Sequence, residues 1–387
     1  MSVSLTKSPP ELVFAGNCII WCLQSSDLGD DDLIKLIGYQ LLSDGVPVMA
    51  MKSIRARAEN TDECINFERH AKRLVFTSIP KPEASATPFE DTNAMRKLTL
   101  KYGSIEIDKV ECSNTVSVDS ESDEIRLINA AFPKFINPQS LVQNNAFVMS
   151  DRPKVNEFTP TSHDWIWVYG GSTVVITAWN TDNNIYYTQA FPTPDNQVTI
   201  VPIGIIQHSL QSTTPRFRVV VNMGSSSKTY WFFKKCVTCD EYNEVLFLEQ
   251  KGGRSTVIFD CDIDIAVSST SQTVKLSMPC VDESSQSLGY DRDILTSYGE
   301  TIADKVSKVP ITLRKVIEDD PKLIEYYKQF LASPSHHLKI KLPNGEWDYV
   351  KFNIVSSGSG IFQSQEDTIL SVTGEYHLPV NFPNSMT

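Results

Sequence analysis

The stretch DWIWVYGGSTVVITAWNTDNN, residues 164–184, decides the fold. It contains two runs of β-branched and aromatic residues, 165–169 and 173–179. Gly170-Gly171 ends the first run, and a cluster of Asn, Thr and Asp at 180–184 ends the second. Short runs of this composition, bounded by turn residues, predict β-strands.

The same pattern of strands and turns extends further along the chain. More strand-like runs follow at close, regular spacing: 185–191, 198–203, 217–222, 229–233, 244–249 and 255–259. Several short strands separated by turn signals are typical of a β-sandwich or barrel. We therefore expect a central β-sandwich-like domain over residues 146–281.

The preceding segment, residues 1–137, is expected to form a β-rich N-terminal domain. Asp44-Gly45 lies between two apolar runs, 35–42 and 46–51. This arrangement predicts a hairpin because glycine readily takes a positive φ. Further strands are expected at 96–102 and 105–107.

The last segment, residues 282–387, carries one helical pattern. Asp320 can accept hydrogen bonds at a helix start, and Pro321 suits the first turn. Apolar residues then recur at helical spacing, which predicts a helix at 321–332: Leu323, Tyr327, Phe330 and Leu331. Strands are expected on both sides of the helix, at 337–342, 347–354 and 369–376, with a hairpin turn at Asn344-Gly345. The expected fold class is mainly β, with two or three sandwich- or barrel-like domains, the C-terminal one with a single helix (α+β).

The composition agrees with a folded β protein. The 387 residues are 41% hydrophobic and 21% charged, which supplies apolar surface for several cores. The net charge is −12, and an acidic surface repels phosphate, so we expect no coating of nucleic acid. The sequence has no run of about 18 apolar residues, so no membrane span is predicted. The polar start, residues 1–10, predicts no signal peptide and synthesis in a cytoplasm.

No residue pattern predicts catalysis or a bound cofactor. Walker A, GxSxG and HExxH motifs are missing from the sequence, and the glycine-rich segment 356–360 is expected to be a plain loop. Cys236 and Cys239 form a CxxC that could join Cys261 and Cys280 in a zinc site, but a second CxxC is missing. We therefore expect no catalytic residue, no cofactor and no metal.

Two further cysteines lie near the N-terminus. Cys18 and Cys22 fall on the same side of an apolar, strand-like run and are expected to be core thiols. Disulfides are not expected, because a cytoplasm keeps thiols reduced.

Aromatic residues form the candidate site. Two tryptophans alternate along one predicted strand, and four aromatics follow one another in another. Four consecutive aromatics cannot all face one core, so a covering layer from another domain or another subunit is expected. The candidate subunit-interface residues are Tyr230, Trp231, Phe232, Phe233, Trp165 and Trp167.

The middle of the chain also carries a composite pattern: a cysteine, an apolar-aromatic strand, a Gly-Gly turn and a strand that ends in Phe. The matching residues are Cys239, 245–248, Gly252-Gly253 and 257–259, preceded by Ser150-Asp151-Arg152-Pro153. This pattern is similar to that of virion proteins of phages that infect Bacteroidetes, including the crAss-like phages. Phe14-Ala15-Gly16-Asn17 resembles their opening strand. The resemblance implies a structural role in the phage neck or tail, as a ring, collar, hub or tube.

We therefore expect a non-enzymatic virion component that connects the portal to the tail and lines or surrounds the DNA conduit. The expected partners are other copies of the chain, in a six- or twelve-fold ring, and other neck or tail proteins, with no membrane and no sequence-specific nucleic acid. The expected location is the virion, after synthesis in the host bacterial cytoplasm. A net negative charge suits such a conduit, because DNA slides past it without sticking.

Two other functions remain open. Exposed aromatic rows also form sugar platforms, so the alternative is a β-sandwich carbohydrate-binding, lectin-like surface or adhesion protein. A hydrolase on a β scaffold is the third hypothesis, and no motif supports it.

Overall fold

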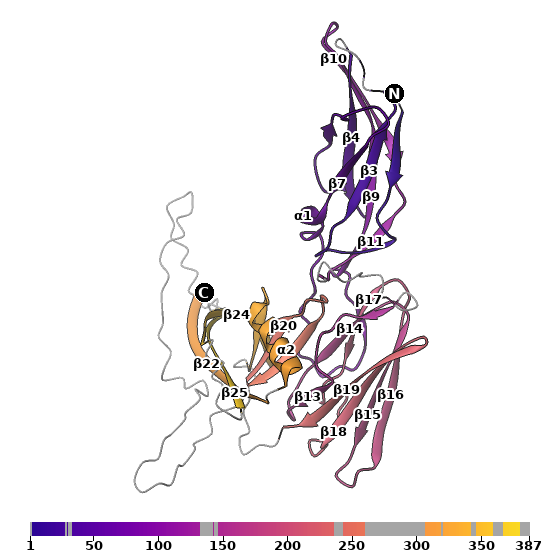
Figure 1. Ribbon diagram of the computed structural model, residues 1–387. Helices are drawn as coiled ribbons and strands as arrows, with labels where there is room; N and C mark the ends of the chain where they lie inside the picture. Colours follow the sequence, from indigo (N-terminus) through magenta and orange to yellow (C-terminus); the bar gives the residue numbers. More distant parts are fainter. Residues whose placement is uncertain are drawn as a thin grey trace, which may run out of the picture.

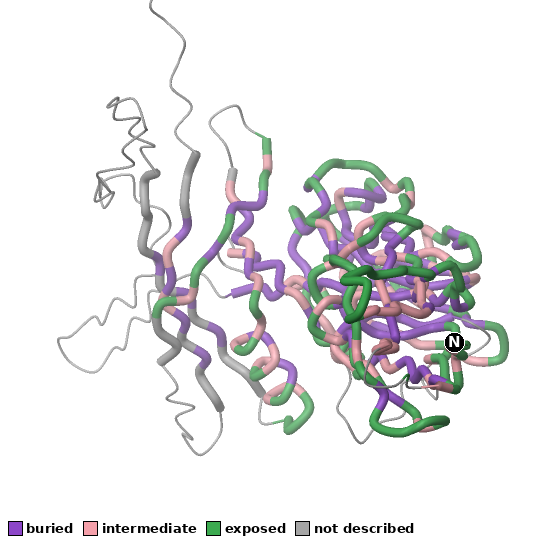
Figure 2. Tube along the Cα trace, turned by 90° about the horizontal axis from the view of Figure 1, so that it is seen from above, coloured by how far each residue is buried: buried purple, intermediate pink, exposed green. Residues whose placement is uncertain are grey.

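A computed structural model of the chain shows three β-rich units (Figure 1). The structure describes residues 2–27, 29, 33–131, 142, 146–235, 243–259, 306–318, 320–341, 346–358 and 367–379. Strands predominate, the units are sandwich-like, and one long helix lies near the C-terminus, which confirms the expected fold class. The N-terminal unit stands above the central unit in Figure 1, and Figure 2 shows the C-terminal unit to one side of both.

The N-terminal unit packs two sheets around one core. The smaller sheet has the order β1-β3-β7, with bounds Val3–Lys7, Ile20–Ser25 and Asp62–Asn66. The larger sheet has the order β2-β11-β9-β4-β5, with β10 on β9 and β6 on β4. Its strands are β2 (Leu12–Phe14), β4 (Leu33–Ser43), β5 (Val46–Pro47), β6 (Lys52–Ile54), β9 (Met95–Asp108), β10 (Ser113–Glu121) and β11 (Ile125–Ile128). The buried side chains of Trp21, Phe67 and Leu100 belong to the core between the sheets.

One local prediction can be followed in this unit. β4 and β5 pair across Asp44 and Gly45, whose φ angles are 50° and 78°. Positive φ at both central residues is the type I′ turn that matches strand twist, so the predicted hairpin is present. A single turn of helix, α1 (Glu68–Ala71), also packs its buried Ala71 into this core.

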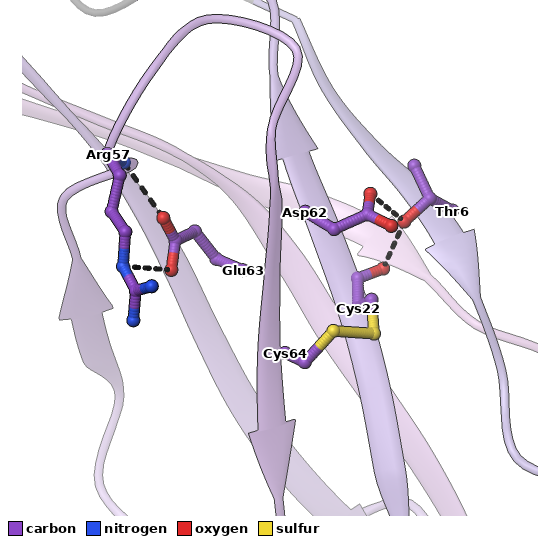
Figure 3. The surroundings of a disulfide bond; sticks show 6 residues. All are labelled: Thr6, Cys22, Arg57, Asp62, Glu63 and Cys64. Atoms are coloured by element: carbon purple, nitrogen blue, oxygen red, sulfur yellow. Dashed lines mark hydrogen bonds and ion pairs between the residues drawn. A yellow bond between two sulfur atoms is a disulfide. The ribbon is translucent and has the colours of Figure 1, made fainter.

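The prediction that the cysteines of this unit remain reduced core thiols is wrong. β3 and β7 pair with Cys22 directly opposite Cys64, and the two form a disulfide (Figure 3). The pairing register brings the two Cβ atoms close enough to be bridged, which sequence distance alone does not reveal. Cys18 is exposed rather than buried in the core.

The central unit is a sandwich of two mostly antiparallel sheets. One sheet has the order β12-β14-β17-β8, with bounds Phe147–Val148, Trp165–Tyr169, Val198–Pro202 and Phe89–Glu90. The other, which we call the outer sheet, has the order β13-β19-β18-β15-β16, with bounds Val155–Phe158, Ser226–Lys234, Arg216–Met223, Ser172–Trp179 and Ile185–Thr193. Val168, Ile176 and Val219 lie in the core between them. The predicted strands at 165–169 and 173–179 are present, one in each sheet.

The C-terminal unit is one six-stranded sheet that packs against a helix. Its order is β21-β20-β23-β24-β25-β22, with bounds Arg254–Phe259, Asn243–Leu248, His336–Lys341, Trp347–Gly358, Asp367–Pro379 and Val306–Glu318. The helix α2 (Pro321–Ala332) begins as predicted, because the Asp320 carboxylate accepts a hydrogen bond from the Lys322 N–H. Tyr326 and Phe330 are its buried residues. The predicted hairpin turn at Asn344-Gly345 lies outside the described residues.

The sequence groups the strands at 244–249 and 255–259 with the central domain, and this grouping is wrong. β20 pairs with β21 and also with β23, with Val245 opposite Leu338. Both strands therefore belong to the C-terminal sheet. Pairing between strands about 90 residues apart is decided by tertiary packing, which a local strand pattern does not encode.

The three units meet around a shared apolar cluster. Phe14 comes from the N-terminal unit, Trp165 and Trp167 from the central unit, and Leu246 and Tyr349 from the C-terminal unit. The turn between β20 and β21 lies in the same place: Gly252 has a φ of +85°, and a Cβ there would lie 1.3 Å from the Asn129 carbonyl oxygen. Only glycine permits this approach of two backbones.

Buried charges join the central and C-terminal units next to this cluster. Within the central unit, Arg152 binds both carboxylate oxygens of Asp164, with Nη1–Oδ2 and Nη2–Oδ1 distances of 2.7 and 3.1 Å. Glu249, at the β20–β21 turn, accepts hydrogen bonds from the Ser150 hydroxyl and the Asp151 N–H. Burial, reinforced by the Asp151 carboxylate, holds the pKa of Glu249 well above its usual value. Two of the segments that carry the phage resemblance, 150–153 and 252–253, therefore lie at this joint.

Candidate interface on the central domain

The four consecutive aromatics of β19 alternate between the two sides of the outer sheet. Tyr230 and Phe232 point inward and belong to the sandwich core. Trp231 is half-buried and Phe233 is 40% exposed. Successive side chains of a strand face opposite sides, so only Trp231 and Phe233 can contact a partner. Tyr230 and Phe232 are therefore removed from the candidate interface.

Strand register arranges the outward side chains in two rows across the outer sheet. The first row runs across β13, β19, β18 and β15 as Val155, Trp231, Arg218 and Thr177. The second row runs across β13, β19, β18, β15 and β16 as Glu157, Phe233, Arg216, Trp179 and Ile185. We call these two rows the aromatic–arginine face. Exposed Val155 and Ile185 lie at its two sides, so the face combines apolar surface with positive charge.

Arginine–tryptophan contacts hold the middle of this face together. The Arg216 and Arg218 guanidinium carbons lie 5.3 and 5.5 Å from the Trp179 ring centroid. They lie 5.8 and 5.5 Å from the Trp231 ring centroid. The two indole centroids are 5.3 Å apart. Cation–π contacts of this kind fix the side chains and leave the guanidinium N–H groups available to carboxylates.

The face is basic on an acidic chain. Residues 216–235 contain five basic residues and no acidic residue. Arg216 donates to the Asn183 side-chain oxygen, and Arg218 forms no ion pair within the described part of the chain. Two uncompensated guanidinium groups beside exposed apolar side chains suit a negatively charged protein surface.

The β13 side of the face is tied to the C-terminal unit. Glu157 pairs with Lys235 and with Lys315 of β22. Burial alone would raise the pKa of Glu157, but the two ammonium groups outweigh it and lower the pKa. Burial, reinforced by the nearby Lys315, lowers the pKa of Lys235 to about 8. These contacts fix the orientation of the face relative to the rest of the molecule.

Trp165 and Trp167 do not form a subunit interface. Their side chains are 1% and 0% exposed and lie in the cluster where the three units meet. Trp165 packs edge-on against Tyr349, with ring centroids 5.9 Å apart, and the Trp167 indole N–H donates to Asp91 at 3.1 Å. Other domains of the same chain therefore cover this strand.

Trp179, Arg216 and Arg218, which make the cation–π contacts of the face, are among the residues that sequence reasoning missed. The signal was present in Arg216-Phe217-Arg218-Val219, which alternates charged and apolar side chains, and such alternation places both arginines on one side of a strand. The contribution of Trp179 depends on the pairing of β15 with β18, which no local pattern reveals.

The described residues offer little to small molecules or metals. No group of three His, Cys, Asp or Glu side chains in the described ranges could hold a metal ion. The CxxC cysteines and their proposed partners, Cys236, Cys239, Cys261 and Cys280, lie outside the described residues. A cleft of about 250 Å³ lies between the N-terminal and C-terminal units, lined by polar side chains such as Lys72 and Gln329 and by apolar ones such as Ala130 and Leu248. Neither helix of the described chain has the length and apolar composition needed to cross a bilayer.

No protein-family profile matches the chain, and no curated protein matches it. The solved structures with some likeness include the calcium-binding domain CBD12 of CALX1.1, at 9% identity and a TM-score of 0.19, over 61% of this chain and all of that one. Dimeric latent PorU from Porphyromonas gingivalis has 8% identity and a TM-score of 0.16, over 61% of this chain and 20% of that one. The titin Z1Z2 domains in complex with telethonin have 10% identity and a TM-score of 0.17, over 61% and 97% of the two chains. Likenesses this distant carry no argument about function.

Proposed function

We propose that the protein is a non-enzymatic structural component of a tailed-phage virion, one subunit of a ring or hub in the neck or tail. The observation that supports this function most is the aromatic–arginine face. It is an ordered, partly exposed, apolar and positively charged surface on a chain of net charge −12. Aromatic residues and arginine are the residue types enriched in protein–protein interfaces.

The junction of the three units also suits an assembly subunit. Apolar packing around Trp165 and Trp167, the Gly252 turn and the hydrogen bonds of Glu249 to Ser150 and Asp151 together hold the units in one arrangement. A subunit whose contact faces are held at fixed angles can close a cyclic assembly by rotation. The ring would be six- or twelve-fold and would contact other neck or tail proteins.

The lectin-like alternative is less well supported by this face. A sugar platform presents an open aromatic ring face. Here guanidinium groups lie over the rings of Trp179 and Trp231. Trp179 is also buried. The face is therefore better suited to carboxylates and apolar side chains of another protein than to a sugar.

Light scattering after size-exclusion chromatography, followed by negative-stain imaging, tests this function. We expect cyclic oligomers of the wild-type chain, and a loss of oligomers in the double variant Trp231→Ser, Phe233→Ser. A matched control, Val46→Ser with Phe76→Ser, removes two exposed apolar side chains elsewhere and is expected to assemble normally. A wild-type chain that stays monomeric at every concentration, or that binds a defined glycan as a monomer, would overturn the proposal.

A further inference from the structure

The β9–β10 hairpin projects from the N-terminal unit as an arm. β9 ends at Asp108 and β10 begins at Ser113, and the hairpin tip is at the top of Figure 1. Within β10 only Val118 is buried. Val110 at the tip is 73% exposed and Val116 is 53% exposed. Such exposure of valines on an ordered hairpin is typical of a surface that a partner covers.

One side of this arm carries apolar side chains that lie outside the core of the N-terminal unit. The register places Ile34 of β4 opposite Ile107, and Leu36 opposite Ile105, which in turn lies opposite Val116 of β10. Residues two apart along a strand share one side, so these five side chains form a continuous apolar ladder. None of them belongs to a hydrophobic core of the described residues, and all remain partly or largely exposed.

The arm is also strongly acidic. Residues 104–121 contain five carboxylates and one lysine. Among the described residues, Glu111, Asp119 and Glu121 are exposed and form no ion pair. The arm therefore carries unpaired negative charge beside an apolar ladder.

The arm and the aromatic–arginine face complement each other. One has five acidic residues and exposed valines, whereas the β18–β19 segment has five basic residues and exposed aromatic and aliphatic side chains. The two features lie at opposite ends of the molecule in Figure 1, with β10 at the top and β18 at the bottom. One copy cannot bring them together, so any contact between them joins two copies.

We infer that the β9–β10 arm of one copy docks on the aromatic–arginine face of the next copy. This inference rests on the proposed function and specifies the partner of the same face. The apolar ladder covers Trp231, Phe233 and Ile185, and the arm carboxylates pair with Arg216 and Arg218. The contact uses two different surfaces of each subunit, so it is heterologous and builds a closed ring or an open filament according to the rotation between copies.

Charge reversal on both sides tests this contact. The face variant is Arg216→Glu, Arg218→Glu, and the arm variant is Glu111→Lys, Asp119→Lys. We expect each variant alone to self-associate at least about tenfold more weakly in sedimentation velocity, because like charges then meet across the contact. Mixing the two variants, or combining all four changes in one chain, is expected to restore the assembly.

Two controls separate this inference from the proposed function. The variant Lys52→Glu, Lys81→Glu makes the same change in charge on exposed lysines elsewhere and is expected to assemble like the wild type. Far-UV circular dichroism and thermal melting check that each variant is folded. A wild-type oligomer that the arm variant leaves intact would overturn the arm contact and leave the proposed function standing, whereas a monomeric wild type would remove both.

Discussion

Lys339 and Glu244 form an ion pair with an Nζ–Oε2 distance of 2.9 Å, and each side chain is only 2% exposed. The two residues lie on neighbouring strands of the C-terminal sheet, β23 and β20, but both also bind the central unit. Lys339 donates to the Thr161 carbonyl oxygen at 2.6 Å, and Glu244 accepts from the Ser162 hydroxyl at 2.8 Å. The pair is thus a polar anchor between two units.

Removal of one partner of this pair is expected to be costly. Lys339→Met leaves the Glu244 carboxylate buried without its cation, and we expect a loss of about 3–5 kcal/mol in the free energy of unfolding. The double variant Glu244→Leu, Lys339→Met should lose much less, because no unpaired charge remains. Urea denaturation of the wild type, the single variants Lys339→Met and Glu244→Leu and the double variant gives the coupling energy. An equal loss in single and double variants would contradict the anchor.

The Cys22–Cys64 disulfide is expected to stabilise the N-terminal unit. The two cysteines are separated by 42 residues, and closing a loop of this length is worth about 4 kcal/mol in the chain-entropy treatment. The variant Cys22→Ser, Cys64→Ser, or reduction of the wild type, should therefore lower the melting temperature. Thiol titration of the unfolded, unreduced protein measures the bond directly, and two extra free thiols per chain would show that it does not form.

Stability is expected to fall in mild acid because His163 is buried in its neutral form. Burial, with a smaller contribution from Lys339, lowers the pKa of His163 to about 3, and its Nδ1 has no hydrogen-bond partner. In the unfolded chain His163 binds a proton near pH 6.5, and in the folded chain it does not, so the contribution of neutral His163 to stability is fully present above that pH. It is lost at about 1.4 kcal/mol per pH unit below it.

The His163 prediction can be checked with one variant. His163→Gln cannot titrate and should flatten the pH dependence of urea denaturation between pH 7 and pH 5. The remaining slope combines His208, His336 and His337, whose pKa values burial also lowers, with Glu249, whose raised pKa gives a slope of the opposite sign. An unchanged slope in the variant would exclude His163 as the source.

Substitution of two tryptophans is expected to have different main effects, one on stability and the other on self-association. Trp167→Ala removes a fully buried side chain at the junction of the units and should cost about 3–5 kcal/mol of unfolding free energy. Trp231→Ala removes a half-buried side chain with two cation–π contacts and should cost about 1 kcal/mol in stability. Its larger effect should be on self-association. Denaturation and sedimentation together distinguish the two roles, and similar losses of stability would contradict them.

The sequence was informative wherever local chemistry decides structure. Asp320 and Pro321 mark the start of α2, Asp44-Gly45 forms the turn between β4 and β5, and runs of β-branched residues mark the strands. In each case a few neighbouring residues determine the conformation, so a short window of sequence contains the answer.

Contacts between segments far apart in the chain could not be predicted from the sequence. The alternation in Tyr230–Phe233 divides the side chains into two sets but does not say which set faces the core. The burial of Trp165 beneath Tyr349 and the bond between Cys22 and Cys64 both join segments far apart in the chain. Such contacts depend on which strands pair and which units dock, and composition and spacing do not record either choice.

The short strand β8 has a consequence for how the chain is made. Phe89 and Glu90 leave the ribosome with the N-terminal unit, yet they pair with Ile200 and Thr199 of β17. More than a hundred residues must be synthesised before that partner exists. A chain that lacks residues 1–90 would leave the edge of β17 without its β8 partner. The N-terminal segment cannot therefore be cut away as a separate module without exposing one edge of β17, which stays paired only with β14. A fragment that starts at residue 146 should aggregate where the whole chain does not.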